Sequence, residues 1–235
     1  MPDELVHRRE PSPNWDERAL PVTMVVLHYT EMETCQASLE RLCDPEAKVS
    51  AHYLISEDGE VIGLVDESKR AWHAGASFWR GLRDVNSARV GIELQHPGHG
   101  LGYREFADEQ FEALVPLLHR IVHEHDVPRA NVVAHSDVAP ARKKDPGELF
   151  PWERLAQYRL CLARPSKLEL GDPFPNDGAF YLALERFGYD ITEGRMAVEA
   201  FQRRWRPERI DGLVDGQIRA ILFQLLLDRD RGLAR

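Results

Sequence analysis

Short apolar runs rich in β-branched residues constrain the fold of this chain more than any other feature of its sequence. They cover residues 22–28 (VTMVVLH), 88–94 (ARVGIEL) and 131–135 (NVVAH), and each has the length of a buried strand. A further region, residues 49–65, has two such runs on either side of Glu57-Asp58-Gly59, which predicts a tight hairpin.

Helical patterns lie between these predicted strands. Apolar residues from Phe111 to Val122 recur at helical spacing, and Asp108 is the predicted N-cap. Pro116 falls inside the pattern and predicts a kink or local unwinding. Residues 34–42 are a weaker helix candidate. Strands that alternate with helices predict an α/β domain, in which helices flank a mixed central β-sheet.

A stretch rich in proline and glycine, residues 163–178, divides the chain. Three helical patterns follow it, at about residues 178–187, 195–204 and 216–228. Three helices in about 60 residues predict a small bundle with a lean core. We therefore predict two domains, residues 1–162 and residues 163–235, the second a small three-helix accessory domain.

Charge and cysteine usage narrow the class of protein. The formal net charge of −9 disfavours a nucleic-acid binder, which needs a basic face. No stretch approaches the roughly 20 apolar residues of a membrane span, and the polar start shows no signal-peptide pattern. Isolated thiols in a reducing compartment are favoured over a Cys35–Cys43 pair, which would close a small loop. The sequence predicts the cytoplasm if Met1 is the native start, and the periplasm if a native signal is missing from this chain.

Two histidines stand at the C-terminal ends of predicted strands, where α/β folds place their active sites. They are His28 and His135. Asp145 follows His135 by ten residues, in a loop that prolines stiffen and that can return the carboxylate to His135. Two imidazoles and one carboxylate with an open fourth position are the ligands of a catalytic zinc ion, and they suit zinc better than magnesium or calcium.

Glu93 places a charged side chain inside an otherwise apolar predicted strand. One interpretation is a salt bridge at a strand end; the other is a general base that accepts a proton from zinc-activated water. Lys143 lies two residues before Asp145, and both side chains project on the same side if that segment is extended. An ammonium there would stabilise an oxyanion formed from a carbonyl group.

Five segments together resemble the type-2 N-acetylmuramoyl-L-alanine amidases, zinc enzymes of bacterial cell-wall turnover. They are LHYTE (27–31), SAHYLI (50–55), AWHAG (71–75), VGIEL (90–94) and AHSDVAPARKKDPGELFPW, which ends at Trp152. The resemblance covers about residues 20–160 and implies the fold of phage lysozyme-type amidases and peptidoglycan recognition proteins. It implies zinc ligands at His28, His135 and Asp145, and catalytic roles for Glu93 and Lys143.

The same resemblance implies a reaction and its partners. Members of the family hydrolyse the amide bond between N-acetylmuramic acid and the L-alanine of the stem peptide, so peptidoglycan fragments are the expected substrates. Residues 178–228 resemble a peptidoglycan-binding helical module through YLALERFGYD and AVEAFQRRWRP. The combination resembles the broad-specificity subgroup, which acts on both muramic and 1,6-anhydro-muramic substrates.

Candidate substrate-binding residues surround the predicted centre. Tyr29 follows His28 directly and is expected to border the metal. For Trp72 and His73, a packed aromatic with a capping histidine and the cleft wall that the resemblance suggests remain open alternatives. Asn86 and Arg142 are candidates for contacts to the sugar or to peptide carboxylates, and Arg142 could bind a carboxylate bidentately.

Two alternatives come from other classes of protein. A non-heme Fe(II) oxygenase also uses two histidines and a carboxylate, but it would leave Glu93 and Lys143 without a role. A binding module of the same fold would have no catalysis. Loss of a metal ligand would favour that module, and all three predicted ligands are present. The sequence therefore favours the zinc amidase.

Overall fold

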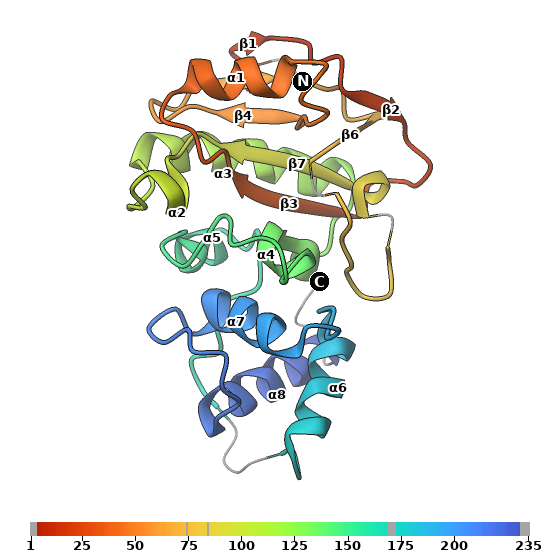
Figure 1. Cartoon of the computed structure of the whole chain (residues 1–235), viewed down its shortest axis with the longest axis vertical. Helices are drawn as coiled ribbons and strands as arrows, with labels where there is room; N and C mark the ends of the chain where they lie inside the picture. The colour runs from red at the N-terminus through yellow and green to blue at the C-terminus, as the bar shows by residue number, and fades with distance from the viewer. Residues whose placement is uncertain (1–3, 74, 84, 169–172, 231–235) are drawn as a thin grey trace.

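The computed structural model describes residues 4–73, 75–83, 85–168 and 173–230, and a six-stranded mixed β-sheet is its centre (Figure 1). Ala74 of the AWHAG segment and residues 169–172 of the predicted linker lie outside the described residues. The strands are β1 (Arg8–Arg9), β2 (Trp15–Glu17), β3 (Met24–Tyr29), β4 (Tyr53–Ile55), β5 (Val61–Gly63), β6 (Lys69–Ala71), β7 (Arg89–Leu94) and β8 (Val132–Ala134). The order in the sheet is β1-β5-β4-β7-β3-β8, and β2 pairs with β6 in a separate two-stranded ribbon.

The pairing confirms a mixed sheet. Strand β3 runs parallel to both of its neighbours, β7 and β8, and β4 runs parallel to β7. Strands β4 and β5 form the predicted antiparallel hairpin. Gly59 in its turn has a φ of +84°, and a Cβ there would lie 2.8 Å from the carbonyl oxygen of Glu109, so the turn needs glycine.

The helices agree with the sequence patterns, with two corrections. The long helix α3 begins at Asp108, so the N-cap is Ala107 and the prediction of Asp108 as N-cap is wrong by one residue. The helix also runs through Pro116 without interruption. The predicted unwinding at Pro116 is therefore wrong. Proline has no N–H to bond the Glu112 carbonyl, but Pro116 and Glu112 are both exposed to water, so the helix continues. The helices are α1 (Cys35–Cys43), α2 (Gly98–Leu101), α3 (Asp108–Glu124), α4 (His135–Val138), α5 (Trp152–Gln157), α6 (Asp177–Phe187), α7 (Gly194–Trp205) and α8 (Gly216–Asp230), with 3-10 turns η1 (Val85–Ala88) and η2 (Arg129–Asn131).

Alternate residues of β3 face two different hydrophobic clusters. Val25 and Leu27 pack in a cluster with residues of α3 and α5, and α3 passes behind the sheet in Figure 1. Met24 and Val26 pack on the opposite face, in a cluster with the helices α6, α7 and α8. Because strand side chains alternate, His28 points to the same face as Met24 and Val26.

Helix α1 covers the other end of the sheet face to which Met24, Val26 and His28 point. Leu39 and Leu42 of α1 pack against Leu54 of β4 and Ile62 of β5. Thr34 caps the helix, because its side chain accepts a hydrogen bond from the Ala37 N–H at 3.1 Å. The carboxyl ends of the central strands therefore lie between α1 on one side and the C-terminal helices on the other (Figure 1).

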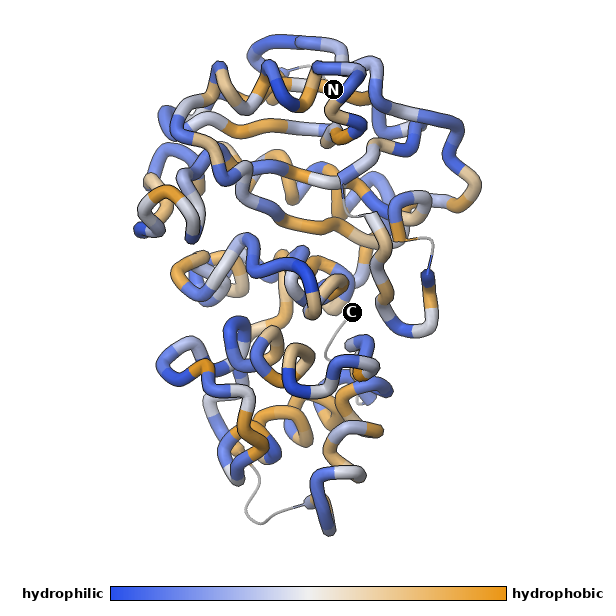
Figure 2. The backbone as a smooth tube through the Cα atoms, viewed as in Figure 1, coloured by the Kyte–Doolittle hydropathy of each residue, from blue (hydrophilic) through white to orange (hydrophobic). Residues whose placement is uncertain are grey.

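The C-terminal segment folds as the three predicted helices, and its core is continuous with the sheet. Figure 2 shows hydrophobic residues along β3 and in the C-terminal helices, and the two regions share one cluster. A buried polar contact joins them as well: Asp137 of α4 accepts hydrogen bonds from Tyr189 Oη at 2.5 Å and from Arg204 Nη1 at 3.0 Å. The division of the chain at residues 162 and 163 stays a prediction.

Two expectations on cysteines and membrane spans also have structural counterparts. Cys35, Cys43 and Cys161 are free thiols. Among the described residues, no helix combines the length and the apolar character that crossing a bilayer requires.

Candidate active site

Strand register brings the first polar residues together. Glu93 of β7 lies between Leu54 of β4 and His28 of β3 in the parallel register, so the three side chains form one row on the face between α1 and the C-terminal helices. His135 is the first residue of α4, directly after β8. The loop after α4 returns to this turn, since the Ser136 N–H donates to the Asp145 carbonyl at 2.9 Å.

The predicted metal ligands converge on one point. The Nδ1 atoms of His28 and His135 are 2.9 Å apart, and Asp145 Oδ2 lies 3.1 Å from the first and 2.9 Å from the second. All three residues are buried, and together they form a candidate metal site. Ligand atoms of a tetrahedral zinc ion with bonds near 2.0–2.1 Å lie about 3.3 Å apart, so this donor set fits zinc in type and in spacing.

Burial sets the protonation of these ligands. It lowers the pKa of His28 to about 3 and lowers the pKa of His135 as well, so both imidazoles are neutral and can donate a lone pair. Burial alone would raise the pKa of Asp145, but the two histidines beside it hold that pKa below its ordinary value. Two neutral imidazoles and one carboxylate are therefore ready to bind a cation at neutral pH.

A second histidine lies behind the first ligand. His73 Nδ1 is 2.8 Å from His28 Nε2, the ring nitrogen that faces away from the candidate metal site. The ring of His73 fits against Gly91 of β7, where a Cβ would lie 2.1 Å from its Cε1 atom. His52 also lies here as a hydrogen-bonded core residue, because its Nδ1 accepts from the Gly91 N–H at 3.0 Å. Glycine at position 91 therefore makes room for the ring that supports His28.

Glu93 faces the candidate metal site from β7. Its Oε1 lies 3.9 Å from His28 Nδ1, and its Oε2 is buried with no hydrogen-bond partner among the described residues. Burial and the Asp145 carboxylate raise the pKa of Glu93 well above its ordinary value, while Lys143 acts in the opposite direction. A carboxylate with a raised pKa beside a candidate metal site is suited to take a proton.

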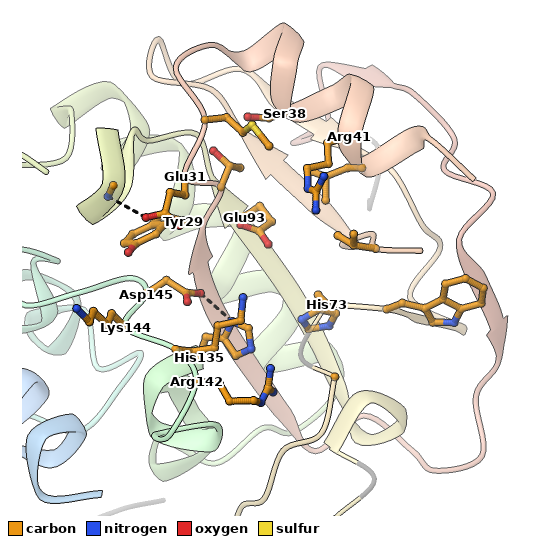
Figure 3. A pocket seen from close by; sticks show the side chains of 18 of the residues that line it. Tyr29, Glu31, Ser38, Arg41, His73, Glu93, His135, Arg142, Lys144 and Asp145 are labelled. Carbon is orange, nitrogen blue, oxygen red and sulfur yellow. Dashed lines mark hydrogen bonds and ion pairs between the residues drawn. The ribbon is translucent and has the colours of Figure 1, made fainter. Parts of the chain in front are cut away.

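These groups lie at the floor of a cavity of about 680 Å³ (Figure 3). Five cationic residues line it, although the chain has a net charge of −9: Arg41, Lys48, Arg142, Lys143 and Lys144. No sequence pattern marked Arg41 or Lys48. Arg41 is an exposed residue of α1, Lys48 is an exposed residue of the loop after it, and only the fold brings them to the cavity.

The predicted substrate-binding residues have different positions. Tyr29, Trp72 and Arg142 line the cavity, and Tyr29 Oη is 2.7 Å from His99 Nδ1 on its rim. His73 also reaches the cavity, but it is buried and supports His28. Asn86 is buried in η1 outside the residues that line the cavity, and its Oδ1 accepts a hydrogen bond from Arg89, so its contact with a substrate stays a prediction.

Comparisons with known proteins agree with this geometry. The family profile of the N-acetylmuramoyl-L-alanine amidases matches residues 18–148. The chain is 36% identical over 230 residues to N-acetylmuramoyl-L-alanine amidase AmiD of Escherichia coli (strain K12), covering 87% of this chain and 82% of that protein.

Two solved structures share the fold over almost the whole chain. One is the complex of AmiD from E. coli with the substrate anhydro-N-acetylmuramic acid-L-Ala-D-gamma-Glu-L-Lys, with a TM-score of 0.80, 35% identity, and coverage of 91% of this chain and 92% of that one. The other is AMPDH3 from Pseudomonas aeruginosa in complex with anhydromuramic pentapeptide, with a TM-score of 0.80, 28% identity, and coverage of 94% and 96%. Both the catalytic sheet and the C-terminal helices therefore have counterparts in these proteins. The chain, with its buried histidines and carboxylates at one end of a mixed sheet, belongs to the N-acetylmuramoyl-L-alanine amidase family of hydrolases.

Proposed function

We propose that this chain uses a zinc ion to hydrolyse the amide bond between N-acetylmuramic or 1,6-anhydro-N-acetylmuramic acid and L-alanine. The convergence of His28, His135 and Asp145 beside Glu93, at the floor of a cationic cavity, carries the proposal. The relatives support the choice of substrate, because two of the similar structures contain anhydromuramic peptides.

His28, His135 and Asp145 would hold the ion through Nδ1, Nδ1 and Oδ2. A zinc ion bound there supplies a water molecule of lowered pKa and a Lewis acid for the carbonyl oxygen. His73 Nδ1, 2.8 Å from His28 Nε2, would hold the ring of His28 in the orientation that points its Nδ1 at the metal.

Glu93 would act as the general base and then as the general acid. In the first role it takes the proton of the attacking water, and in the second it returns that proton to the amine of L-alanine as the bond breaks. The raised pKa of Glu93 favours the first step, because it makes the carboxylate a stronger base. The Lys143 ammonium lines the same cavity and would stabilise the negative charge on the carbonyl oxygen in the transition state.

The cavity walls would orient the substrate. The stem peptide carries free carboxylates, and Arg41 and Lys48 give one wall of the cavity positive charge. Arg142 and Tyr29 would border the scissile amide from the other sides. The large aromatic ring of Trp72 would pack against the peptide at the outer end of the cavity.

The test is mass spectrometry of an anhydro-muramyl tripeptide incubated with the purified protein. Release of free tripeptide should stop after treatment with a chelator and return after zinc is added. The reaction should also proceed without oxygen, unlike that of an Fe(II) oxygenase. A folded, zinc-loaded protein that cleaves neither this substrate nor the corresponding muramyl peptide would contradict the proposal.

Substitution of Glu93 tests its role separately from metal binding. Glu93→Gln should keep one zinc ion per chain and lose turnover, since the amide cannot accept the proton. Glu105→Gln is the matched control, because Glu105 is an exposed residue outside the residues that line the cavity. Near-normal rates in Glu93→Gln would exclude the general-base role.

The compartment is a separate proposal. We propose the cytoplasm, where recycled anhydro-muropeptides would be the substrates. Fractionation of the native host, with detection of the protein in each fraction, tests this placement. Recovery in the periplasmic fraction would overturn it and make intact peptidoglycan accessible as a substrate.

A further inference from the structure

Two segments with no part in the proposed reaction meet beside the catalytic cavity, the cavity of about 680 Å³ at the candidate metal site. One is the loop at residues 96–103, and the other is the turn that follows the candidate metal ligand Asp145. The ring of Tyr103 stacks on the ring of His99, with 4.0 Å between the centroids and 17° between the planes. The Tyr103 hydroxyl donates to the Pro146 carbonyl at 2.9 Å. The loop and the turn therefore pack together through Tyr103.

A chain of polar contacts runs from this loop to the end of β3. His99 Nδ1 lies 2.7 Å from the hydroxyl oxygen of Tyr29, and His99 Nε2 lies 3.2 Å from Glu148 Oε2. Tyr29 and His99 both line the catalytic cavity, and Figure 3 shows Tyr29 among the side chains that surround it. Tyr29 also follows the candidate metal ligand His28 directly. The chain therefore links a wall of the cavity to the carboxylate of Glu148.

Helix α7 holds this carboxylate from the other side. Arg203 of α7 is buried, and its Nε lies 3.4 Å from Glu148 Oε2. Burial alone would raise the pKa of Glu148, but the hydrogen bond with His99 and the positive charge of Arg203 contribute to lowering that pKa overall. Glu148 is therefore ionised at neutral pH, and an ionised carboxylate can only accept hydrogen bonds.

The ionised carboxylate sets the direction of each hydrogen bond in the chain. His99 Nε2 carries a proton and donates it to Glu148, so in the neutral ring Nδ1 has a lone pair. The Tyr29 hydroxyl then donates to Nδ1. The backbone N–H of His99 lies 3.4 Å from the Tyr29 oxygen and takes one of its lone pairs. A hydroxyl oxygen can accept two hydrogen bonds, which leaves the second lone pair for an N–H donor in the cavity.

We propose that Glu148 and His99 are positioning residues, which orient the Tyr29 hydroxyl so that its oxygen accepts a hydrogen bond from an amide N–H of the substrate. This inference rests on the proposed amidase function, whose substrate is a peptide with such N–H groups. Without the imidazole, the hydroxyl can rotate and point its proton into the cavity, where it meets the N–H group as a second donor. The contact is made in the bound substrate and in the transition state alike, so it lowers KM without changing kcat.

The experiment measures hydrolysis and binding of the anhydro-muramyl tripeptide. His99→Phe keeps a ring to stack on Tyr103 and removes both ring nitrogens. His99→Asn keeps an acceptor near the position of Nδ1, and Glu148→Met removes the acceptor that fixes the imidazole proton. His119→Phe, at an exposed position of α3 outside the residues that line the cavity, is the matched control.

His99→Phe should raise KM about fivefold, the effect of one hydrogen bond, and leave kcat within about twofold of wild type. Glu148→Met should raise KM by a smaller factor, and His99→Asn should recover most of the wild-type KM. His119→Phe should keep the wild-type KM. A second readout does not depend on turnover: in the Glu93→Gln protein, calorimetry should show the same fivefold rise in the Kd of the tripeptide when His99→Phe is added.

A double-mutant cycle separates positioning from a general loss of packing. Tyr29→Phe removes the hydroxyl that His99 orients, so His99→Phe should have no further effect on KM in that variant. The positioning role is overturned if the two effects on KM multiply, if His99→Phe alone leaves KM and Kd unchanged, or if it lowers kcat instead. Such results leave the amidase function intact, because the tripeptide is still cleaved. A folded, zinc-loaded wild-type protein that cleaves neither this tripeptide nor the muramyl peptide contradicts the amidase function itself, and the inference with it.

Discussion

The buried ion pair between Arg204 and Asp137 should make the C-terminal helices important for the stability of the whole chain. The side chains of Arg204 and Asp137 are 4% and 1% exposed, and their charged atoms are 3.0 Å apart. The Arg204 guanidinium also lies 3.7 Å from the centre of the Trp152 ring and donates to the Val132 carbonyl at 3.1 Å. Arg204→Met would keep an apolar side chain of similar length and leave the Asp137 carboxylate buried without its cation.

Removing one partner of a buried ion pair costs about 3–5 kcal/mol, because the remaining charge is not compensated. For a chain of this size each kcal/mol lowers Tm by about 2–4 °C, so Arg204→Met should lower it by roughly 6–20 °C. Arg186→Met is the matched control, since Arg186 and its partner Asp230 are 66% and 48% exposed. An exposed pair contributes about 0–1 kcal/mol, so this control should lower Tm by at most about 4 °C.

The assay is thermal unfolding followed by circular dichroism, with urea unfolding to obtain free energies. The double variant Asp137→Asn/Arg204→Met should recover part of the loss. The reason is that a neutral amide can still accept from the Ala134 N–H and contact Tyr189 without burying a charge. The reasoning would be refuted if Arg204→Met unfolded within 1 kcal/mol of the wild-type protein, or if the double variant were no more stable than the single one.

Three further predictions concern the metal site, the reaction and the pH dependence of stability. Gly91→Ala should push the His73 ring away from His28 and weaken zinc binding about 10–100-fold in competition with a chromogenic chelator; unchanged affinity would contradict the role of His73. Lys143→Met should lower kcat about 10²–10³-fold with full zinc content, and a steady-state rate close to wild type would exclude oxyanion stabilisation. Burial alone would raise the pKa of Glu67, but hydrogen bonds from Arg120 and two other side chains outweigh it and lower that pKa from 4.5. The ionised carboxylate therefore stabilises the folded state above that ordinary value, and this contribution disappears as the pH falls through the lowered pKa. Glu67→Gln should destabilise the protein to urea at pH 7, and this difference should shrink as the pH is lowered below 4.5, whereas a constant difference would argue against the linkage.

The sequence by itself determined the elements and the chemistry of the centre. Apolar runs of strand length ended at His28 and His135. Asp145 followed His135 by only ten residues, which limits how far its carboxylate can lie from His135. Such patterns are local, because hydrophobic periodicity and turn residues act over a few positions of the chain. The residues of the candidate metal site and Glu93 could therefore be named before the fold was described.

Only the tertiary structure decided which other side chains meet that centre. The fold buries Asn86, a candidate substrate contact, against Arg89, while Arg41 and Lys48 reach the cavity from a helix and a loop that no motif marks. His73 supports His28 across 45 positions of sequence, through a contact that needs the small residue Gly91 in the neighbouring strand. The contacts that join the sheet to the C-terminal helices were also decided only by the tertiary structure. Contacts between distant segments depend on packing and strand register, and neither is written in any single stretch of the chain.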